Sequence, residues 1–377
     1  MMTTALVILA FGLAVLFAII VRGWCEDVAR ALMDAPDAAT GTSATVAHIV
    51  PARDAEDTIV PLLQDLYEQG RPGHPPSVIV VDDGSSDGTA DKVRAMIPRW
   101  SGLRLLPCDG QGKKAAITTG VNATDAGWIV LTDADARCGP DRTRLLLACA
   151  ERTRADMVLL PVATDGQGVL GAIQSNEQAA LMMCAMATTL QGRPLLANGA
   201  NMAFRREAFL ELGGYNGDRF ASGDDVFLVQ RMMRAGKRIA ALPHPDAVVR
   251  TQAEPTFSGA VQQRLRWAGK MRGVSWSAKL LPAFFLLYPW GLLALTVGIN
   301  WPALVGHQLL MHALLLAGAW ALWLAPVPAL VHHGKRILGL PYSTWSAGLA
   351  WLAFTIYAPL IAVASLVVRP VWKGRRV

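Results

Sequence analysis

The stretch Trp128-Ile-Val-Leu-Thr-Asp133-Ala-Asp135 is the most informative part of this 377-residue chain. Its apolar first half predicts a buried strand, and two carboxylates one residue apart follow that strand. Because side chains alternate along an extended chain, Asp133 and Asp135 can lie on one side and share a divalent cation, which can hold a diphosphate. An acidic surface loop gives the same pattern, so the interpretation depends on the other motifs of the chain.

Strand and helix patterns alternate along residues 45–162. We predict strands at 45–50, 77–81, 103–106, 128–131 and 156–162, and helices at 54–67, from the second strand's loop to residue 96, and at 113–122. This succession predicts an α/β fold with a mainly parallel sheet and helices on both of its faces. Ligands of such sheets bind outside the carboxyl ends of the strands.

Two more motifs follow predicted strands. Pro51-Ala-Arg-Asp54 comes after the first strand, and Asp82-Asp-Gly-Ser85 comes after the second. We expect both motifs to meet the Asp133 motif at one edge of the sheet. Asp83, or its neighbour Asp82, could accept hydrogen bonds from a nucleobase, although an Asp-Gly-Ser sequence also serves simply to turn the chain.

Charged pairs stand at the starts of two predicted helices. Lys113 and Lys114 follow Gly110-Gln-Gly112, where they could meet a phosphate or a base, or lie on a solvated helix. Asp224 and Asp225 open an apolar helix at 226–233. A helix N-cap explains one carboxylate, and the second, if it lies beside an active site, indicates a general base.

The sequence Gln263-Arg-Leu-Arg-Trp267 precedes a long apolar stretch. Arg266 could offset the charge of a leaving diphosphate, and Trp267 could stack on a sugar ring. A basic and aromatic patch at a membrane interface is the alternative explanation. Residues 256–272 carry apolar and basic side chains at helical spacing, which favours a helix lying along an interface.

Long uncharged stretches predict membrane spans. The chain is 53% hydrophobic, and Asp, Glu, Lys and Arg are absent before Arg22, between Lys279 and Lys335, and between Arg336 and Arg369. We predict one span at 5–21, two within 280–334 around a turn at 298–302, and one within 337–368 that starts near Trp345. Buried core helices of a soluble protein are the alternative.

Positive residues beside these stretches predict the orientation. Arg22 and Arg30 after the first span, and Lys335 and Arg336 after the third, place the charged domain in the cytoplasm of a multi-pass protein of the cell inner (plasma) membrane. Four spans would put the basic tail at 369–377 outside, against the same rule. Either the last stretch is re-entrant or interfacial, or the rule fails here.

Charge and cysteine content exclude some classes of partner. The net charge is +6, and much of the excess lies beside the predicted spans, where anionic lipid headgroups explain it. We find no basic-aromatic motif for nucleic acid, so we expect no nucleic-acid partner. Five cysteines without paired spacing predict reduced thiols and neither a disulfide framework nor a zinc site.

The ordered set of motifs resembles the membrane-integrated family 2 glycosyltransferases. This group has the GT-A fold, a Rossmann-like nucleotide-diphospho-sugar transferase domain, and includes cellulose, hyaluronan, chitin and poly-N-acetylglucosamine synthases and ceramide glucosyltransferases. The matching pieces are Val50–Asp54, Val81–Thr89, Gly112–Ala116, Thr132–Asp135, Asn198–Arg205, Gly223–Asp225 and Gln263–Trp267. They span residues 45 to 267 in the order that the family has.

The resemblance implies a role for each site residue. It implies that Asp225, beside Asp224, is the base, and that Asp135, helped by Asp133, ligates Mg²⁺ or Mn²⁺. The donor nucleotide would be held by Pro51, Ala52, Arg53, Glu56, Asp82, Asp83, Lys113 and Asp133. The diphosphate and acceptor would meet Gln263, Arg266 and Trp267. The chain departs from the family at Asp54-Ala-Glu56, where Asn-Glu is common, and at Asp224-Asp225, where Glu-Asp is common.

The resemblance and the chemistry together predict an inverting, metal-dependent transfer from a nucleotide sugar, in most relatives a UDP-sugar. A metal and an arginine meet the charge of the leaving diphosphate, and a carboxylate takes the proton of the attacking hydroxyl. We expect a lipid or lipid-linked acceptor, with processive polysaccharide synthesis on a glycan acceptor as the alternative. A non-catalytic scaffold or transporter is a second alternative.

The predicted organisation has six parts. They are a transmembrane anchor at 1–22, a juxtamembrane linker at 23–44, a cytoplasmic catalytic domain at 45–255, an interfacial helix at 256–279, a region of about three spans at 280–368 and a basic tail at 369–377.

Overall fold

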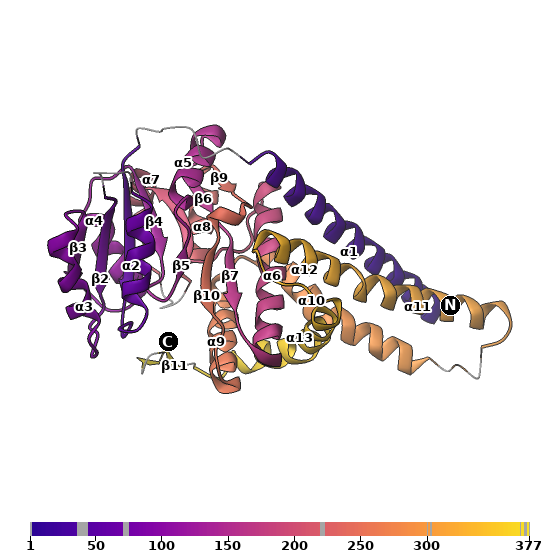
Figure 1. Ribbon diagram of the computed structural model, residues 1–377. Coiled ribbons are helices and arrows are strands. Elements are labelled where there is room, and N and C mark those ends of the chain that lie inside the picture. Colours follow the sequence, from indigo (N-terminus) through magenta and orange to yellow (C-terminus); the bar gives the residue numbers. More distant parts are fainter. Residues whose placement is uncertain are drawn as a thin grey trace.

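One sheet organises residues 46–241. The computed structural model describes residues 2–35, 44–70, 75–218, 223–299, 301, 304–369, 371–372 and 375–376. In these residues seven strands form the sheet, in the order β3-β2-β1-β4-β8-β6-β9 (Figure 1). They are β1 (Val46–Ala52), β2 (Ser77–Asp82), β3 (Leu103–Pro107), β4 (Trp128–Thr132), β6 (Met157–Leu159), β8 (Asn201–Arg205) and β9 (Ile239–Ala241). Only β8 runs antiparallel to its described neighbours, which confirms the mainly parallel sheet.

Helices cover both faces of this sheet. On one face lie α2 (Ile59–Glu68), α3 (Thr89–Met96) and α5 (Arg142–Thr153), and Leu62 of α2 packs with Val50. On the other lie α4 (Lys113–Asn122), α7 (Arg206–Glu211) and α8 (Asp224–Arg234), and Ile117 of α4 packs with Ile49. Adjacent strand residues such as Ile49 and Val50 point to opposite faces, so a continuous apolar strand serves both layers.

The strand register brings three predicted motifs to one edge. Ala52 at the end of β1 pairs with Asp82 at the end of β2, and Ile49 pairs with Leu131 of β4. Thr132 pairs with Asn201, so the antiparallel β8 begins where β4 ends. The loops that carry the carboxylates therefore leave the sheet side by side.

A second, three-stranded sheet lies beyond this edge. It consists of β5 (Arg137–Cys138), β10 (Val249–Gln252) and β7 (Val162–Asp165), in that order. The single strand predicted at 156–162 is wrong, because β6 and β7 belong to different sheets. Pro161 stands between them and has no N–H for a ladder hydrogen bond.

Two helices join the sheet domain to a helical bundle. α6 (Gly168–Leu190) packs against helices of the bundle, and α9 (Phe257–Lys270) leads through a 3₁₀ turn (Met271–Gly273) into α10 (Trp276–Gly298). The hydroxyl of Thr256 accepts a hydrogen bond from the N–H of Gly259 at 3.1 Å and caps the start of α9.

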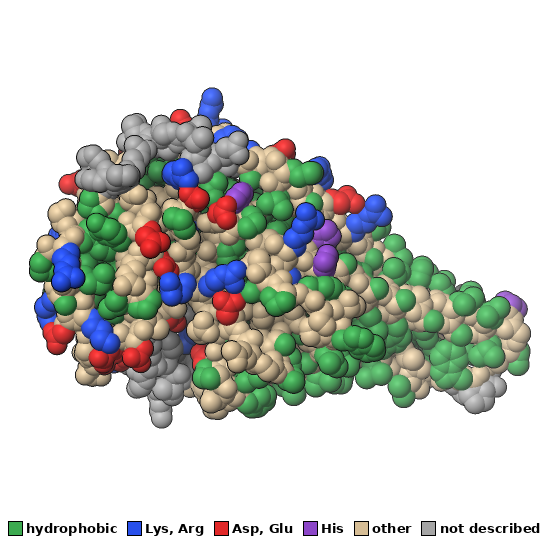
Figure 2. Space-filling model, in the orientation of Figure 1, with side chains coloured by type: hydrophobic (Ala, Val, Ile, Leu, Met, Phe, Trp, Pro, Cys, Tyr) green, Lys and Arg blue, Asp and Glu red, His purple; other side chains and the backbone are tan. Residues whose placement is uncertain are grey.

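The bundle contains the predicted apolar stretches as helices. Among the described residues four helical stretches are long and apolar enough to cross a membrane: Met2–Met33, Ala278–Gly298, His307–Ile337 and Thr344–Ala364. They correspond to α1 (Met2–Met33), α10, α11 (His307–Leu324) with α12 (Pro326–Ile337), and α13 (Thr344–Ala364). α1, α10 and α11 extend together away from the sheet (Figure 1), and hydrophobic side chains cover that extension (Figure 2).

Aromatic rings fill the interior of the bundle. Trp323 is fully buried and contacts Phe17 of α1, Tyr288 of α10 and Trp351 of α13, with ring centroids 4.7, 5.1 and 5.0 Å away. Burial of such large rings contributes strongly to packing. His312 is also buried and lies 3.3 Å from the Thr4 hydroxyl, as expected for a histidine in the bundle interior.

Two predicted boundaries differ from the structure. α1 does not end at residue 22 but continues to Met33, so the first part of the predicted linker at 23–44 is helical. Pairs of Arg22 with Glu26 and of Arg30 with Asp27, at helical spacing, favour this extension. Residues 36–43 of the predicted linker lie outside the described residues. The helix predicted at 54–67 starts at Ile59, because the preceding residues bind the loop after β2.

Candidate active site

The two aspartates after β2 have different partners. The carboxylate of Asp82 accepts a hydrogen bond from the backbone N–H of Ser85 at 3.1 Å and stabilises the turn. Asp83 is buried, and its carboxylate accepts a hydrogen bond from the N–H of Gly112 at 2.9 Å. Gly112 has a φ of +91°, a left-handed conformation that favours glycine, and directly precedes α4. Asp83 therefore links the end of β2 to the start of α4.

Lys113 joins two of the acidic motifs. Its ammonium lies 2.7 Å from a carboxylate oxygen of Asp133 and 3.0 Å from one of Asp224. Burial disfavours the charged ammonium, but the two carboxylates outweigh this effect and raise the pKa of Lys113. Lys114, the neighbouring candidate, instead forms an ion pair with Asp218 at 2.8 Å.

Gly199 lies directly against the ion triad that Lys113 forms with Asp133 and Asp224. A Cβ atom at Gly199 would lie 2.3 Å from Oδ2 of Asp224 and 3.0 Å from Nζ of Lys113. The loop before β8 can approach the charged groups this closely only because it has no side chain there.

Asp224 and Asp225 open α8 directly after Gly223, whose φ is +89°. Both carboxylates are buried. The ammonium of Lys270, at the end of α9, lies 3.2 Å from each carboxylate oxygen of Asp225. Burial opposes ionisation of Asp224, but Lys113 and then Lys270 outweigh it and lower the pKa of Asp224. Lys270 was not predicted as a site residue; its position one turn after Arg266 on the same helix is the signal that points to it.

Arg266 lies in the field of the same acidic groups. Burial lowers the pKa of its guanidinium, and four nearby carboxylates act in the opposite direction. They belong to Glu254, Asp133, Asp224 and Asp135. α9 thus brings Arg266 and Lys270 to the carboxylates that follow β4 and begin α8.

Gln263 and Trp267 contact a different residue of α9. The side-chain oxygen of Gln263 accepts a hydrogen bond from Arg264 at 3.1 Å, and the Arg264 guanidinium lies over the Trp267 ring, 5.6 Å from its centroid. Arg264 is itself buried and donates to Glu177 of α6 at 3.1 Å. Arg264, which was not predicted as a site residue, therefore fixes this part of the Gln-X-X-Arg-Trp motif against α6.

The predicted residues at the end of β1 and directly after it support the loop that follows β2. Arg53 donates to the backbone oxygen of Asp83 at 3.0 Å, and the backbone oxygen of Ala52 accepts from the N–H of Asp83 at 2.8 Å. Glu56 accepts from the N–H of Gly88 at 3.0 Å. Pro51 pairs with Val81 inside the sheet. These residues hold the loop of Asp83 rather than the ion triad of Lys113.

Asp133 and Asp135 offer carboxylate oxygens, the ligand type that hard divalent cations prefer. Asp135 is exposed and Asp133 is partly exposed at the strand end. Mg²⁺, and by the same hard-oxygen preference Mn²⁺, uses one or two carboxylates and completes its shell with water and substrate phosphate oxygens. In the part of the chain that the structure describes, no three His, Cys, Asp or Glu side chains enclose a metal position. A site of this kind would depend on the substrate's oxygens.

A buried arginine supports the strand end beneath Asp133. Arg142 is fully buried, and its guanidinium donates to the Thr132 hydroxyl at 3.0 Å and to the Asn201 side-chain oxygen at 3.4 Å. It also lies 3.3 Å from His48. Burial, together with the charge of Arg142, lowers the pKa of His48 to about 3. Sequence reasoning missed this cluster, which connects β1, β4 and β8.

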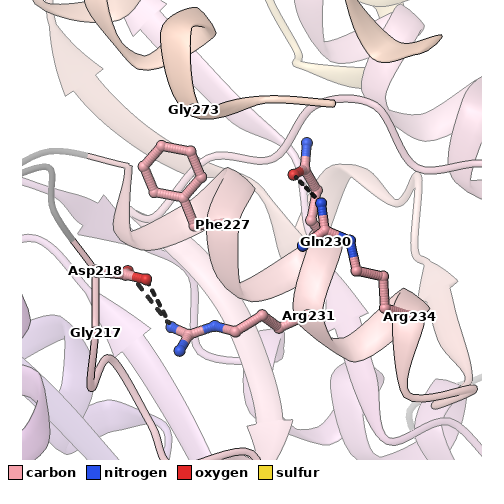
Figure 3. A pocket seen from close by; sticks show the side chains of 7 residues that line it. All are labelled: Gly217, Asp218, Phe227, Gln230, Arg231, Arg234 and Gly273. Atoms are coloured by element: carbon pink, nitrogen blue, oxygen red, sulfur yellow. Dashed lines mark hydrogen bonds and ion pairs between the residues drawn. The ribbon is translucent and has the colours of Figure 1, made fainter. Parts of the chain in front are cut away.

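A pocket of about 230 Å³ lies on α8 beside this site (Figure 3). Asp218 and Arg231 pair across it at 3.4 Å, and Gly273, in the turn between α9 and α10, also lines it. Its lining residues are Gly217, Asp218, Phe227, Gln230, Arg231, Arg234 and Gly273. None of them was a predicted site residue.

Comparison with known proteins identifies relatives for the sheet domain. A family model described as glycosyltransferase like family 2 matches residues 44–270. The chain is 25% identical over 219 residues to a poly-β-1,6-N-acetyl-D-glucosamine synthase of Staphylococcus aureus, covering 56% of this chain and 50% of that protein. It is 28% identical over 208 residues to the succinoglycan biosynthesis protein ExoO of Rhizobium meliloti, covering 52% and 58%. The chain spans about half the length of these curated relatives.

The fold is also similar to that of a solved structure. The mannosyltransferase PcManGT from Pyrobaculum calidifontis, in complex with GDP-mannose and Mn²⁺, superposes with a TM-score of 0.55 at 22% sequence identity. The similarity covers 94% of this chain and 98% of that chain. At this identity the likeness establishes the GT-A fold and no more.

Proposed function

Because this chain belongs to glycosyltransferase family 2, we propose that it moves one sugar from a nucleotide-diphosphate sugar to a lipid or lipid-linked acceptor at a membrane. One observation carries the proposal: a continuous set of contacts connects Asp83 to Asp225. Asp83 binds the N–H of Gly112, Lys113 pairs with Asp133 and Asp224, and Lys270 pairs with Asp225. Donor, diphosphate and acceptor groups can therefore meet in one place.

The donor lies along the strand ends in this proposal. The Asp83 carboxylate binds the nucleobase of the donor, and Arg53 and Ala52 hold Asp83 in place through hydrogen bonds to its backbone. The loop that contains Asp83 is shaped by Pro51, Asp82 and Glu56. Lys113 is placed to bind the diphosphate, since its charge already faces Asp133. We propose a UDP-sugar as donor. The PcManGT structure holds GDP-mannose, so a GDP-sugar is the alternative to test.

Asp135 and Asp133 would hold Mg²⁺ or Mn²⁺. Bound there, the cation supplies a positive charge against which a diphosphate can leave. Arg266 and Lys113 add fixed positive charge on the same side, and both are partly buried. Preorganised charges in such a site stabilise developing negative charge better than water does.

Asp225 is the general base in this proposal. A sugar hydroxyl is a weak nucleophile, so its proton must pass to a carboxylate as the hydroxyl attacks. Lys270 holds both oxygens of Asp225 and fixes the orientation of the carboxylate. Attack from the side opposite the diphosphate inverts the anomeric centre, so an α-linked donor gives a β-linked product.

The acceptor is proposed to come from the membrane. α9, which carries Arg266, Trp267 and Lys270, packs directly against the apolar helix α13. An acceptor with a lipid tail can reach Asp225 from that side. The named activity of the Staphylococcus aureus relative favours processive polysaccharide synthesis as a second candidate. A non-catalytic scaffold or transporter would neither transfer the sugar to an acceptor nor hydrolyse the nucleotide sugar.

One experiment separates these functions. The detergent-solubilised protein is given radiolabelled UDP-glucose, UDP-N-acetylglucosamine, UDP-galactose or GDP-mannose with membrane lipid extract, with Mn²⁺ or with EDTA. Metal-dependent label in a lipid-soluble product supports the proposal, and label in a polymer supports the second candidate. No nucleotide release from any donor would contradict both.

A further inference from the structure

The last apolar helix, α13, contacts the catalytic side of the molecule at both of its ends. Near its start, the Ser346 hydroxyl accepts a hydrogen bond from Asn176 of α6 at 3.2 Å. Beyond its end, the backbone oxygen of Ser365 accepts a hydrogen bond from Arg272, in the turn that precedes α10. α6 joins the two parts of the molecule and packs against β7 and β9 of the sheets, and Arg272 lies in the turn before α10 begins. Both ends of α13 are therefore near the sheet domain.

The other apolar helices have one end far from the sheet domain. The start of α1 and the start of α11 meet at the remote tip of the bundle, where Thr4 lies 3.3 Å from His312. Figure 1 shows the amino terminus at this tip, whereas β11 (Val371–Trp372), which follows α13, lies beside the catalytic domain. A 21-residue helix is about 32 Å long, enough to separate its two ends by a whole hydrocarbon core. The two ends of α13 are not separated in this way, because each contacts residues near the sheet domain.

One face of α13 is apolar and exposed. Its side chains recur every three or four residues and are between 51% and 85% exposed: Trp345, Leu349, Leu352, Ile356, Leu360 and Val363. The opposite face is buried, and there the Trp351 indole donates to the backbone oxygen of Trp323 at 3.3 Å. The buried face is apolar because it packs against the bundle. With both faces apolar, α13 has the amino-acid composition of a membrane-spanning helix whether or not it crosses the membrane.

We propose that α13 lies flat in the lipid leaflet nearest the catalytic domain, with its exposed face against acyl chains. The surface is continuous with the apolar surface of α1, α10 and α11. The basic groups that flank α13 and α10 are those that anionic headgroups attract: the exposed Arg272 and Arg369 and the partly exposed Lys279. The chain then crosses the membrane three times, and Arg369 stays on the side of the catalytic domain.

This arrangement removes a conflict in the charge pattern. With four crossings the basic tail would lie on the side opposite Arg22 and Arg30, against the positive-inside rule. With three crossings all these positive groups share one side. α13 also forms the membrane-facing support of α9 and its Arg264–Glu177 ion pair, so a flat helix borders the path of a lipid acceptor. The inference rests on the proposal that α1, α10 and α11 span a bilayer, and not on the transfer chemistry.

Cysteine labelling tests the sidedness. Thr3→Cys, Arg369→Cys and, as a reference in the catalytic domain, Glu151→Cys are exposed positions, and the unchanged chain gives the background of its own five cysteines. A membrane-impermeant maleimide is applied to intact and to permeabilised cells. We expect Arg369→Cys to label with Glu151→Cys and opposite to Thr3→Cys. Arg369→Cys and Thr3→Cys on the same side would overturn the inference. Thr3→Cys and Glu151→Cys on the same side would overturn its premise of a spanning α1.

Depth measurement provides a second, independent readout. Nitroxide labels at Leu349→Cys and Leu360→Cys, in protein reconstituted into vesicles that contain phosphatidylglycerol, report depth through collision with oxygen and a nickel chelate. A flat helix places both labels at nearly equal depth. Eleven residues of a crossing helix would separate them by about 16 Å, and that result would overturn the inference.

Discussion

The ammonium of Lys270 lies 3.2 Å from both carboxylate oxygens of Asp225, and both side chains are largely buried. This pair connects α9, which leads into the helical bundle, with α8, which carries the proposed base. Removal of one partner of a buried ion pair leaves the other charge unpaired and costs about 3–5 kcal/mol. The Asp225 carboxylate would then lose the contact that fixes its orientation.

We predict that Lys270→Met lowers kcat by on the order of 10²-fold and changes donor KM less, because Lys270 is a positioning residue for the base. The comparison of kcat with donor KM is the diagnostic measurement, because a residue that orients the base affects turnover more than donor binding. Lys237→Met, which removes a lysine from a surface pair with Glu211, is the matched control. An unchanged kcat would show that Lys270 has no such role.

A substitution at Gly199 tests the ion triad of Lys113, Asp133 and Asp224 by adding a methyl group without changing any charge. A methyl group there would stand 2.3 Å from the Asp224 carboxylate, so Gly199→Ala must displace Asp224 or Lys113. A displacement of about 1 Å in an active site lowers rates by on the order of 10²-fold, and we expect a loss of that size. Gly127→Ala, where the nearest atom is 3.7 Å away, should retain activity. Equal activity of both variants would argue against a catalytic place for the triad.

Metal dependence should follow Asp135. We expect EDTA to abolish transfer and Mn²⁺ or Mg²⁺ to restore it. Asp135→Asn should raise the Mn²⁺ concentration needed for half-maximal activity by on the order of 10-fold or more, because one of two carboxylate ligands loses its charge. Asp125→Asn, at a fully exposed position, is the control. Full activity of the protein in EDTA would show that transfer needs no divalent cation.

Acid should destabilise the sheet domain through His48. Its pKa is lowered to about 3 in the fold, against 6.5 for an ordinary histidine, so below pH 6.5 the unfolded chain binds a proton that the folded chain excludes. The free energy of unfolding therefore falls as the pH drops, by about 2 kcal/mol between pH 6.5 and pH 5. We expect His48→Gln to flatten this part of the curve of apparent Tm against pH. A parallel loss in the variant and in the unchanged protein would contradict the assignment.

The strand ends could be predicted from the sequence because they depend on local patterns. Apolar runs separated by helices fix a parallel sheet, and a parallel sheet brings the residues after β1, β2 and β4 to one edge whatever the details of packing. Asp83 and Asp133 follow from that rule. The split of the 156–162 strand shows its limit, because a single proline redirected the chain into a second sheet.

The residues that sequence reasoning missed depend on distant packing. Lys270 meets Asp225 only because the end of α9 lies beside the start of α8, 45 positions earlier in the chain, and Arg142 meets Asn201 across 59 positions. The placement of α13 was open for another reason. A helix with one lipid-facing side and one bundle-facing side is apolar all round whether it crosses the membrane or lies in it.

The most direct test of the central claim is the turnover and donor affinity of Asp225→Asn. The substitution preserves the size of the side chain and removes its capacity to take a proton. We predict that transfer falls by at least about 10²-fold, while the Kd for the nucleotide sugar, measured by calorimetry with Mn²⁺ present, stays at the value of the unchanged protein. A variant that keeps most of its turnover would show that Asp225 is not the base.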